Sequence, residues 1–200
     1  MDKFGKVTAY LFLTAILPLW SLGFATAGEP TEQIRAAIER GVEVLKDAKL
    51  NGAKERAETV QRLKQVVYPL FDFEEMAKRS LGAHWRRLDP PRQKEFVALF
   101  TELLERTYAN SINLYDGQTV TYTGETLDGD YAEVSTKIIT KKGEAFSAVY
   151  KLHRVDGKWK IYDLVAEGIS VVNNYRSQFN RVIVNSSLEE LMRRLKEKAA

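Results

Sequence analysis

The stretch 163-DLVAEGISVVNNYRSQF-179 decides the expected fold, because it joins a β-strand directly to an α-helix. Up to Gly168 the residues continue the two-residue alternation of a strand. After it, apolar residues recur at the spacing of one helix face, at Ile169, Val172, Tyr175 and Phe179. The junction therefore sets an apolar strand against an apolar helix face. Two such surfaces enclose either a filled core or a cavity that holds something else.

Four strands are predicted before and into this junction, at 119–127, 131–140, 144–154 and 158–167. The joints between them are short glycine-containing hairpin signals, 128-DG-129, 142-KG-143 and 156-DG-157. Strands joined by such short turns pair with their neighbours in antiparallel order. The pattern predicts a four-stranded antiparallel meander.

Helical periodicity lies on both sides of the meander, at 31–49, 54–70, 71–85, 90–114, 170–184 and 187–198. Residues typical of helix N-caps stand at four of the expected starts, at Asp72, Asp89, Ser170 and Ser187. Helices, then one antiparallel sheet, then helices indicate the α+β class, with helices packed on one face of the sheet. A strongly curved sheet would form a cone with helices across its mouth.

The first 27 residues are predicted to be a secretory signal peptide. Lys3 and Lys6 give a basic start, 7-VTAYLFLTAILPLWSLGF-24 carries no charge, and 25-ATA-27 has the small-x-small pattern of a cleavage site. An uncleaved anchor is the alternative, because the apolar run approaches the roughly 20 residues that span a bilayer. Pro18 and the Ala-Thr-Ala end favour cleavage.

The remaining residues, 28–200, have the length of a single domain. The chain has no Cys, which excludes disulfides, thiolate metal sites, a thiol nucleophile and the acylated cysteine of a bacterial lipoprotein. A formal charge of only +3 does not suggest nucleic-acid binding, which usually needs a clustered basic face. An exported, unanchored protein without disulfides fits the bacterial periplasm.

Motifs for catalysis or metal binding are not found in the sequence. The two histidines, His84 and His153, lie in different predicted elements. There is no His-Glu-x-x-His, no glycine-rich phosphate loop after a strand and no Gly-x-Ser-x-Gly. We therefore expect no bound metal and no catalytic residue.

Asp163 is the one acid that strand alternation places on an apolar face, together with Ile161. A buried carboxylate needs a partner, and Arg176 on the next helix is expected to form a structural ion pair with it. The alternative is a small-molecule enzyme of a cone-shaped α+β fold, in which Asp163 acts with Tyr150 or Tyr162. A strand bulge that turns Asp163 to the other face is also possible.

The strongest signal is the apolar surface of the predicted sheet and of the helices expected to face it. The sheet contributes Val134, Ile138, Phe146, Tyr150, Ile161 and Val165. The helices contribute Phe100, Leu104, Tyr108, Val172, Tyr175 and Phe179. Hydrophobic periodicity does not distinguish a filled core from a ligand cavity. A periplasmic interaction module with a solid core is therefore an alternative to a ligand carrier.

The blocks 71-FDFEEMAKRSLGAHW-85, 93-QKEFVALFTELLERTYANSI-112 and 157-GKWKIYDLVAEGISVVNNYRSQF-179 stand in an order that resembles the MlaC family. These are the periplasmic phospholipid-binding proteins of the toluene-tolerance and maintenance-of-lipid-asymmetry system. The resemblance covers nearly all of the chain after the signal peptide. The segment 184-VNSSLEELMRRL-195 departs from it, because a glycine-containing turn is expected before the last helix.

The resemblance implies a curved sheet and helices that enclose a deep apolar cavity, with phospholipid as cargo, no cofactor and no enzymatic activity. It implies that acyl chains contact Phe100, Leu103, Leu104, Tyr108, Val134, Ile138, Phe146, Tyr150, Ile161, Val165, Val171, Val172, Tyr175 and Phe179. The implied partners are an inner-membrane ABC transporter complex with an MCE-domain protein and an outer-membrane lipoprotein–porin complex, between which the protein shuttles lipid. A carrier of hopanoids or of another lipid is the alternative within the family. We expect a monomer.

Overall fold

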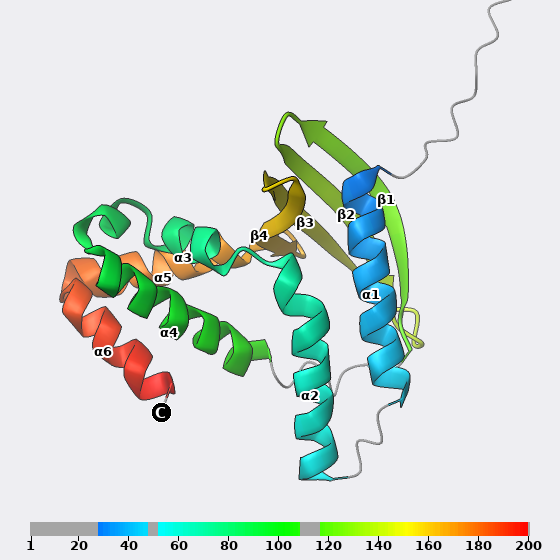
Figure 1. The fold of residues 1–200 in the computed structure, drawn as a ribbon, viewed down its shortest axis with the longest axis horizontal. Coiled ribbons are helices and arrows are strands. Elements are labelled where there is room, and N and C mark those ends of the chain that lie inside the picture. Colours follow the sequence, from blue (N-terminus) through cyan, green and yellow to red (C-terminus); the bar gives the residue numbers. More distant parts are fainter. Residues whose placement is uncertain (1–27, 48–51, 109–116, 200) are drawn as a thin grey trace, which may run out of the picture.

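The computed structural model describes residues 28–47, 52–108 and 117–199. The predicted signal peptide, and the end of the helix expected over 90–114, lie outside these residues. Figure 1 shows the arrangement, in which a twisted sheet lies beside a bundle of helices. None of the helices in the described ranges combines the length and the apolar character that a membrane span requires.

The helices form close to the ranges that the hydrophobic periodicity predicts, and four of them begin just after the predicted N-cap residues. They are α1 (Glu29–Asp47), α2 (Ala53–Val67), η1 (Tyr68–Leu70), α3 (Phe73–Leu81), η2 (Gly82–Arg87), α4 (Pro90–Tyr108), α5 (Val171–Asn185) and α6 (Leu188–Ala199). All four expected N-caps accept a hydrogen bond from the backbone N–H three residues on, at Asp72 (2.9 Å), Asp89, Ser170 and Ser187 (3.0 Å each).

The sheet has five strands, in the order β1-β2-β3-β4-β5, with every neighbouring pair antiparallel. The strands are β1 (Thr119–Asp128), β2 (Tyr131–Ile139), β3 (Ala145–Val155), β4 (Lys158–Ala166) and β5 (Ile169–Ser170). The predicted meander is confirmed, and the fifth strand adds to it. β5 has only two residues, which pair with the end of β4 before α5 begins, too short for alternation to reveal.

A bulge in β4 corrects the predicted faces of this strand. Ile161 pairs with Leu152, but Asp163 pairs with Lys151, so one extra residue stands between the two pairs on β4. Beyond the bulge, Leu164 is therefore on the face of Ile161, while Asp163 is on the opposite face. The alternation expected from the sequence was wrong at this point, although a bulge had been one of the alternatives.

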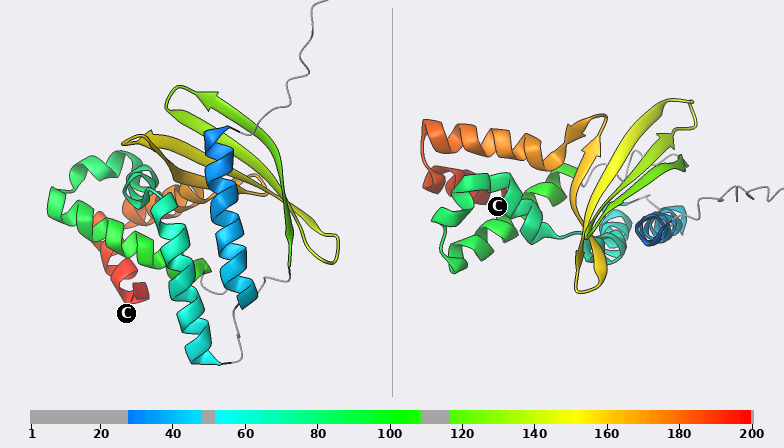
Figure 2. Two further views of the ribbon diagram at one scale, coloured as in Figure 1. Left: turned by 45° about the vertical axis from the view of Figure 1, so that its right-hand side comes forward. Right: turned by 90° about the horizontal axis from the view of Figure 1, so that it is seen from above.

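The apolar side chains of the sheet and of the helices form two separate cores. The sheet core lies where α1 crosses the strands, and its buried members are Ile34, Ala132, Val134, Leu152, Trp159 and Ile161. The helical core lies among α3–α6, beyond the β4 side of the sheet, as the right-hand view of Figure 2 shows. Its centre is an aromatic core of four rings, Phe96, Phe100, Tyr175 and Phe179, with ring centroids 5.4–6.0 Å apart.

Candidate functional site: an apolar cavity between the two cores

An apolar cavity of about 590 Å³ lies at the junction of the two cores. Six elements build its wall: α1, α2, α3, α4, β4 and the start of α5, together with the η1 segment. The lining residues are Leu45, Val60, Leu63, Lys64, Val67, Tyr68, Phe71, Phe73, Met76, Leu104, Glu105, Arg106, Leu164 and Val171. Its size falls within the ~300–1,000 Å³ that is usual for small-molecule sites.

One wall of the cavity is a single face of α2. Val60, Leu63, Lys64 and Val67 follow the i, i+3, i+4, i+7 spacing that places side chains on one side of a helix. α2 packs along α1 and continues into η1, so this apolar face is left to line the cavity. The apolar stripe of α2 therefore faces open space rather than a tightly packed partner.

The floor of the cavity is aromatic and is fixed to the sheet. Phe71 stacks on Phe73 at 5.6 Å, and Tyr68 meets the edge of Phe73 at 5.1 Å. The backbone N–H of Asp72 donates to the carbonyl of Ile161 on β4 at 2.9 Å. This bond holds the segment between η1 and α3 against the strand, so the rings form a rigid surface.

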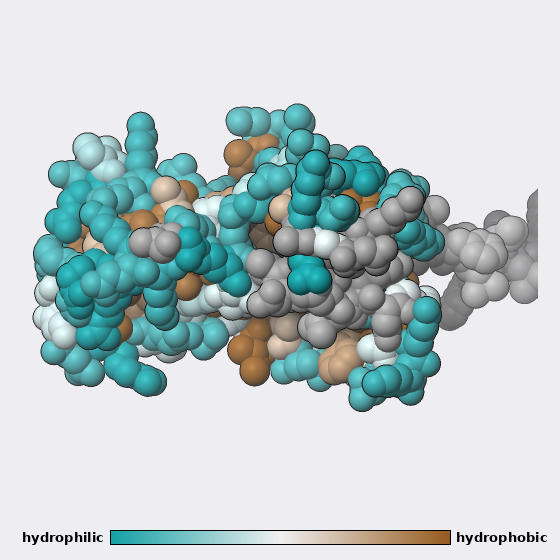
Figure 3. All heavy atoms as spheres, turned by 90° about the horizontal axis from the view of Figure 1, so that it is seen from below, coloured by the Kyte–Doolittle hydropathy of each residue, from teal (hydrophilic) through white to brown (hydrophobic). Residues whose placement is uncertain are grey.

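The far wall joins both cores. Leu104 of α4, Met76 of α3 and Val171 of α5 come from the helical bundle, and Leu164 comes from β4. Leu164 reaches the cavity because the bulge has moved it to this face of the sheet. Seen from below in Figure 3, hydrophobic surface gathers near the middle of the molecule, between a largely hydrophilic bundle and the sheet side.

Polar groups in the wall are few. Lys64 of α2 forms an ion pair with Glu105 of α4, and its ammonium lies 5.6 Å from the centre of the Tyr68 ring. The Tyr68 hydroxyl is buried and has no hydrogen-bond partner among the described residues. A buried hydroxyl without a partner is unfavourable. The cavity therefore suits a long apolar group.

Comparison with known proteins agrees with this geometry. The family model described as MlaC protein matches residues 35–197, which is most of the chain. The chain belongs to the MlaC family. The sequence-based prediction of this family, and of its α+β fold, is therefore confirmed.

Two relatives and one protein of known structure are similar to this chain. The intermembrane phospholipid transport system binding protein MlaC of Haemophilus influenzae is 23% identical over 137 residues, or 66% of this chain and 64% of the relative. Toluene tolerance protein Ttg2D of Pseudomonas putida is 24% identical over 174 residues, 84% of this chain and 78% of the relative. The phospholipid-binding protein of Ralstonia solanacearum, solved with a phospholipid, has a TM-score of 0.72 at 23% identity, covering 84% of this chain and 95% of that one.

Among the described side chains, two of the residues predicted to contact lipid line the cavity of this MlaC-family chain, Leu104 and Val171. The other described ones are distributed over the two cores and the surface. Phe100, Val172, Tyr175 and Phe179 are buried in the helical core, and Leu103 packs against it. Val134 and Ile161 are buried in the sheet core, and Tyr150 packs against it.

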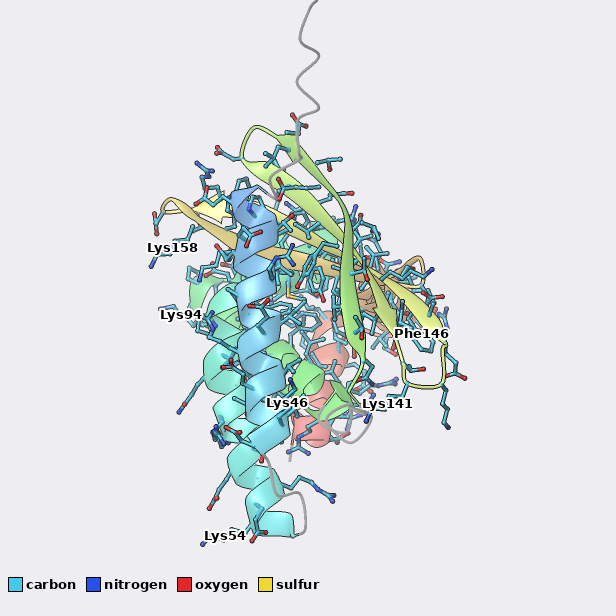
Figure 4. All side chains as sticks on the ribbon, turned by 90° about the vertical axis from the view of Figure 1, so that its right-hand side faces the viewer. Lys46, Lys54, Lys94, Lys141, Phe146 and Lys158 are labelled. Carbon is cyan, nitrogen blue, oxygen red and sulfur yellow. The ribbon has the colours of Figure 1, made fainter. Side chains whose placement is uncertain are left out.

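Three further predicted contacts lie in neither core. Ile138 and Val165 are partly buried, and the bulge places Val165 on the face opposite Ile161. Phe146 is 43% exposed and lies at the start of β3, near the β2–β3 hairpin, as Figure 4 shows. The Tyr108 side chain lies outside the described residues. The cavity residues that sequence reasoning missed are those of α2 and of 68–76, although the apolar stripe of α2 was visible in the sequence.

The predicted ion pair between Asp163 and Arg176 is not formed. Asp163 is buried and accepts hydrogen bonds from the Ser170 hydroxyl (2.6 Å) and from the Val172 backbone N–H (3.0 Å). The carboxylate thus anchors the start of α5 to β4, which satisfies it without a cation. Tyr150 pairs with Leu164 and lies on the other face of the sheet, and burial raises the pKa of the Tyr150 hydroxyl above its ordinary value.

Proposed function

We propose that this protein is a periplasmic phospholipid carrier that holds acyl chains in the apolar cavity. The observation that supports this most directly is the cavity itself, about 590 Å³ in volume, with eleven of its fourteen lining side chains apolar or aromatic. A protein-interaction module with a solid core would have side chains filling this space. The family, and the printed names of relatives that bind or transport phospholipid, agree with this proposal.

The physical need for a carrier follows from the cost of exposing acyl chains to water. Burial of one methylene is worth about 0.8 kcal/mol, so two chains with roughly 30 methylenes represent on the order of 20 kcal/mol. A phospholipid therefore passes from a membrane into water very slowly. A carrier whose interior is as apolar as the membrane core lets the lipid cross the aqueous space, and no covalent bond has to form or break.

The route of the lipid is a further part of the proposal. A relative named as the binding protein of an intermembrane phospholipid transport system supports exchange between two membranes. We propose as partners an inner-membrane ABC transporter complex with an MCE-domain protein and an outer-membrane lipoprotein–porin complex. Export by the signal peptide at 1–27, cleaved after Ala27, would bring the protein into the space between them.

An enzyme that uses Asp163 is not favoured by the geometry. Both oxygens of the Asp163 carboxylate accept hydrogen bonds that hold α5, and Tyr150 lies across the sheet from it. In the described residues, no three His, Asp or Glu side chains are grouped in a way that could hold a metal ion. A hopanoid in place of the phospholipid would need the same apolar wall, so the extracted cargo decides between these two lipids.

The proposal is tested by transfer of a fluorescent phospholipid from donor to acceptor vesicles. The protein is expected to raise the transfer rate in proportion to its concentration. Leu63→Glu places a carboxylate in the cavity wall, and burying that charge costs several kcal/mol, so transfer should fall at least about tenfold. Gln65→Glu on the exposed side of the same helix is the matched control and should transfer normally. Equal transfer by both folded variants would contradict the proposal.

A further inference from the structure

A second pocket of about 400 Å³ lies behind the apolar cavity, on the other side of α3, β4 and the start of α5. Neighbouring residues of the same elements line the two spaces. On β4, Leu164 faces the apolar cavity and Asp163 faces the second pocket. On α5, Val171 faces the first and Val172 the second. The bulge in β4 thus separates two spaces of different chemistry.

Positive charge dominates the second pocket, which we call the basic pocket. Five cations from four elements line it: Lys78 and Arg79 of α3, Arg86 of η2, Lys151 of β3 and Arg176 of α5. One acid is among the lining residues, Asp163, and both of its oxygens already accept hydrogen bonds. The pocket therefore presents more cations than its own carboxylate can balance.

Three of the cations have acidic partners outside the pocket. Lys78 and Arg79 both pair with Glu75 at 2.9 Å, so two cations share one carboxylate. Lys151 pairs with Glu133 at 2.8 Å, and this hydrogen bond raises the pKa of the lysine, which stays charged. These carboxylates reduce the positive charge around the pocket without removing it.

The other two cations, Arg86 and Arg176, form no hydrogen bond or ion pair with any described residue. Arg176 lies against the backbone at the end of α3. Its Nε and Nη2 atoms lie 2.9 and 3.0 Å from the position that a Cβ of Gly82 would take, so a larger residue at Gly82 would displace the guanidinium from this position. Gly82 also has a φ of +56°, which other residues rarely adopt. The guanidinium of Arg176 therefore lies close to Gly82, while the residue as a whole is exposed to solvent.

We infer that the basic pocket binds a compact phosphate-class anion. Cations that converge from four elements on one concave space suit a small, multiply acidic group, and arginine guanidinium forms paired hydrogen bonds to phosphate oxygens. The pocket is separate from the apolar cavity, so this inference goes beyond the proposed lipid carriage. Free phosphate and the phosphodiester headgroup of a lipid share this chemistry.

The test follows the indole N–H signals of Trp85, which lines the basic pocket, and of Trp159, which is buried in the sheet core. The secreted protein is titrated by NMR with inorganic phosphate or with glycerophosphoglycerol, a water-soluble lipid headgroup, at constant ionic strength. The Trp85 signal should shift to saturation while that of Trp159 stays. Saturation by phosphate alone would support a free phosphate site, and saturation by glycerophosphoglycerol alone would support a headgroup site.

Variants separate a built site from general electrostatic attraction. Arg86→Gln with Arg176→Gln should weaken binding about a hundredfold, because each lost charged hydrogen bond is worth about tenfold. Arg181→Gln, an exposed arginine on the same helix as Arg176, should leave it unchanged. The double variant should retain the normal lipid content, which keeps this test independent of the lipid cavity. Absence of a saturable Trp85 shift in the folded wild type, or equal loss in the Arg181 variant, would overturn the inference.

Discussion

The aromatic core and the apolar cavity are neighbours in the same molecule, made of similar side chains, yet only the first is filled. In the aromatic core, rings from α4 and α5 meet edge to face, and Phe96 and Phe100 are fully buried. In the cavity, the side chains of α2 face a space of about 590 Å³. Apolar character alone therefore does not decide whether a surface becomes core or binding site. What decides it is whether a second surface approaches closely enough to fill the space.

The position of α2 explains the difference. α4 and α5 are brought together with α3 and α6 in one bundle, whereas α2 packs along α1 on the sheet side of the molecule (Figure 1). Across the cavity, α2 meets α4 through the ion pair between Lys64 and Glu105. Valine and leucine on α2 are too short to fill the gap between these two units. The gap between the two cores thus arises because α3–α6 form one bundle while α1 and α2 pack on the sheet side.

The largest expected effect on stability comes from the aromatic core. Phe100→Ala removes a fully buried ring that contacts Tyr175 and Phe179, and should lower the free energy of unfolding by about 3–5 kcal/mol. Urea denaturation measures the change. Phe146→Ala, at an exposed phenylalanine, is the matched control and should stay within about 0.5 kcal/mol of the wild type. Similar losses at the two positions would mean that the aromatic core is not tightly packed.

Truncation in the cavity wall should cost less than truncation in the core. Leu63→Ala removes a side chain that borders open space, so it creates little new cavity, and the delipidated protein should lose only about 1 kcal/mol. The same urea experiment applies, with lipid removed beforehand. A loss as large as that of Phe100→Ala would show that Leu63 is tightly packed in solution, and the contrast between core and cavity would fail.

The smallest expected effect concerns the unpaired hydroxyl. Tyr68→Phe should leave the delipidated protein as stable as the wild type or up to about 1 kcal/mol more stable, because it removes a buried donor without a partner. Phospholipid binding should change little, because the buried hydroxyl does not face the cavity. Competition with a fluorescent lipid measures this. A clear loss of stability without lipid would show that the hydroxyl is paired within the protein.

Much of the fold could be predicted from the sequence, because the signals for it are local. Hairpin turns, N-caps such as Asp72 and Ser170, and the change of period from helix to strand each act within a few residues. The bulge in β4 could not be placed, since an extra residue in a strand leaves no distinct mark on hydrophobic alternation. It moved Leu164 into the cavity and took Asp163 and Val165 out of the expected face.

The cavity was harder to predict, because its position depends on distances between elements. The most apolar helix faces, those of α4 and α5, were expected to contact lipid, and in this structure they pack against one another. The shorter apolar stripe of α2 lines the cavity because none of the described helices covers it. A sequence shows which faces are apolar, and packing in three dimensions determines which of them remain available to a ligand.

If the space between the two cores holds lipid, the purified protein should carry that lipid with it. The protein is purified without detergent and extracted with organic solvent, and the extract is analysed by mass spectrometry with phosphorus quantified per protein. We expect phospholipid in stoichiometric amount, and a Leu63→Glu variant that carries less than about a tenth of it. A folded wild-type protein whose extract contains no lipid would show that the space is not a lipid site.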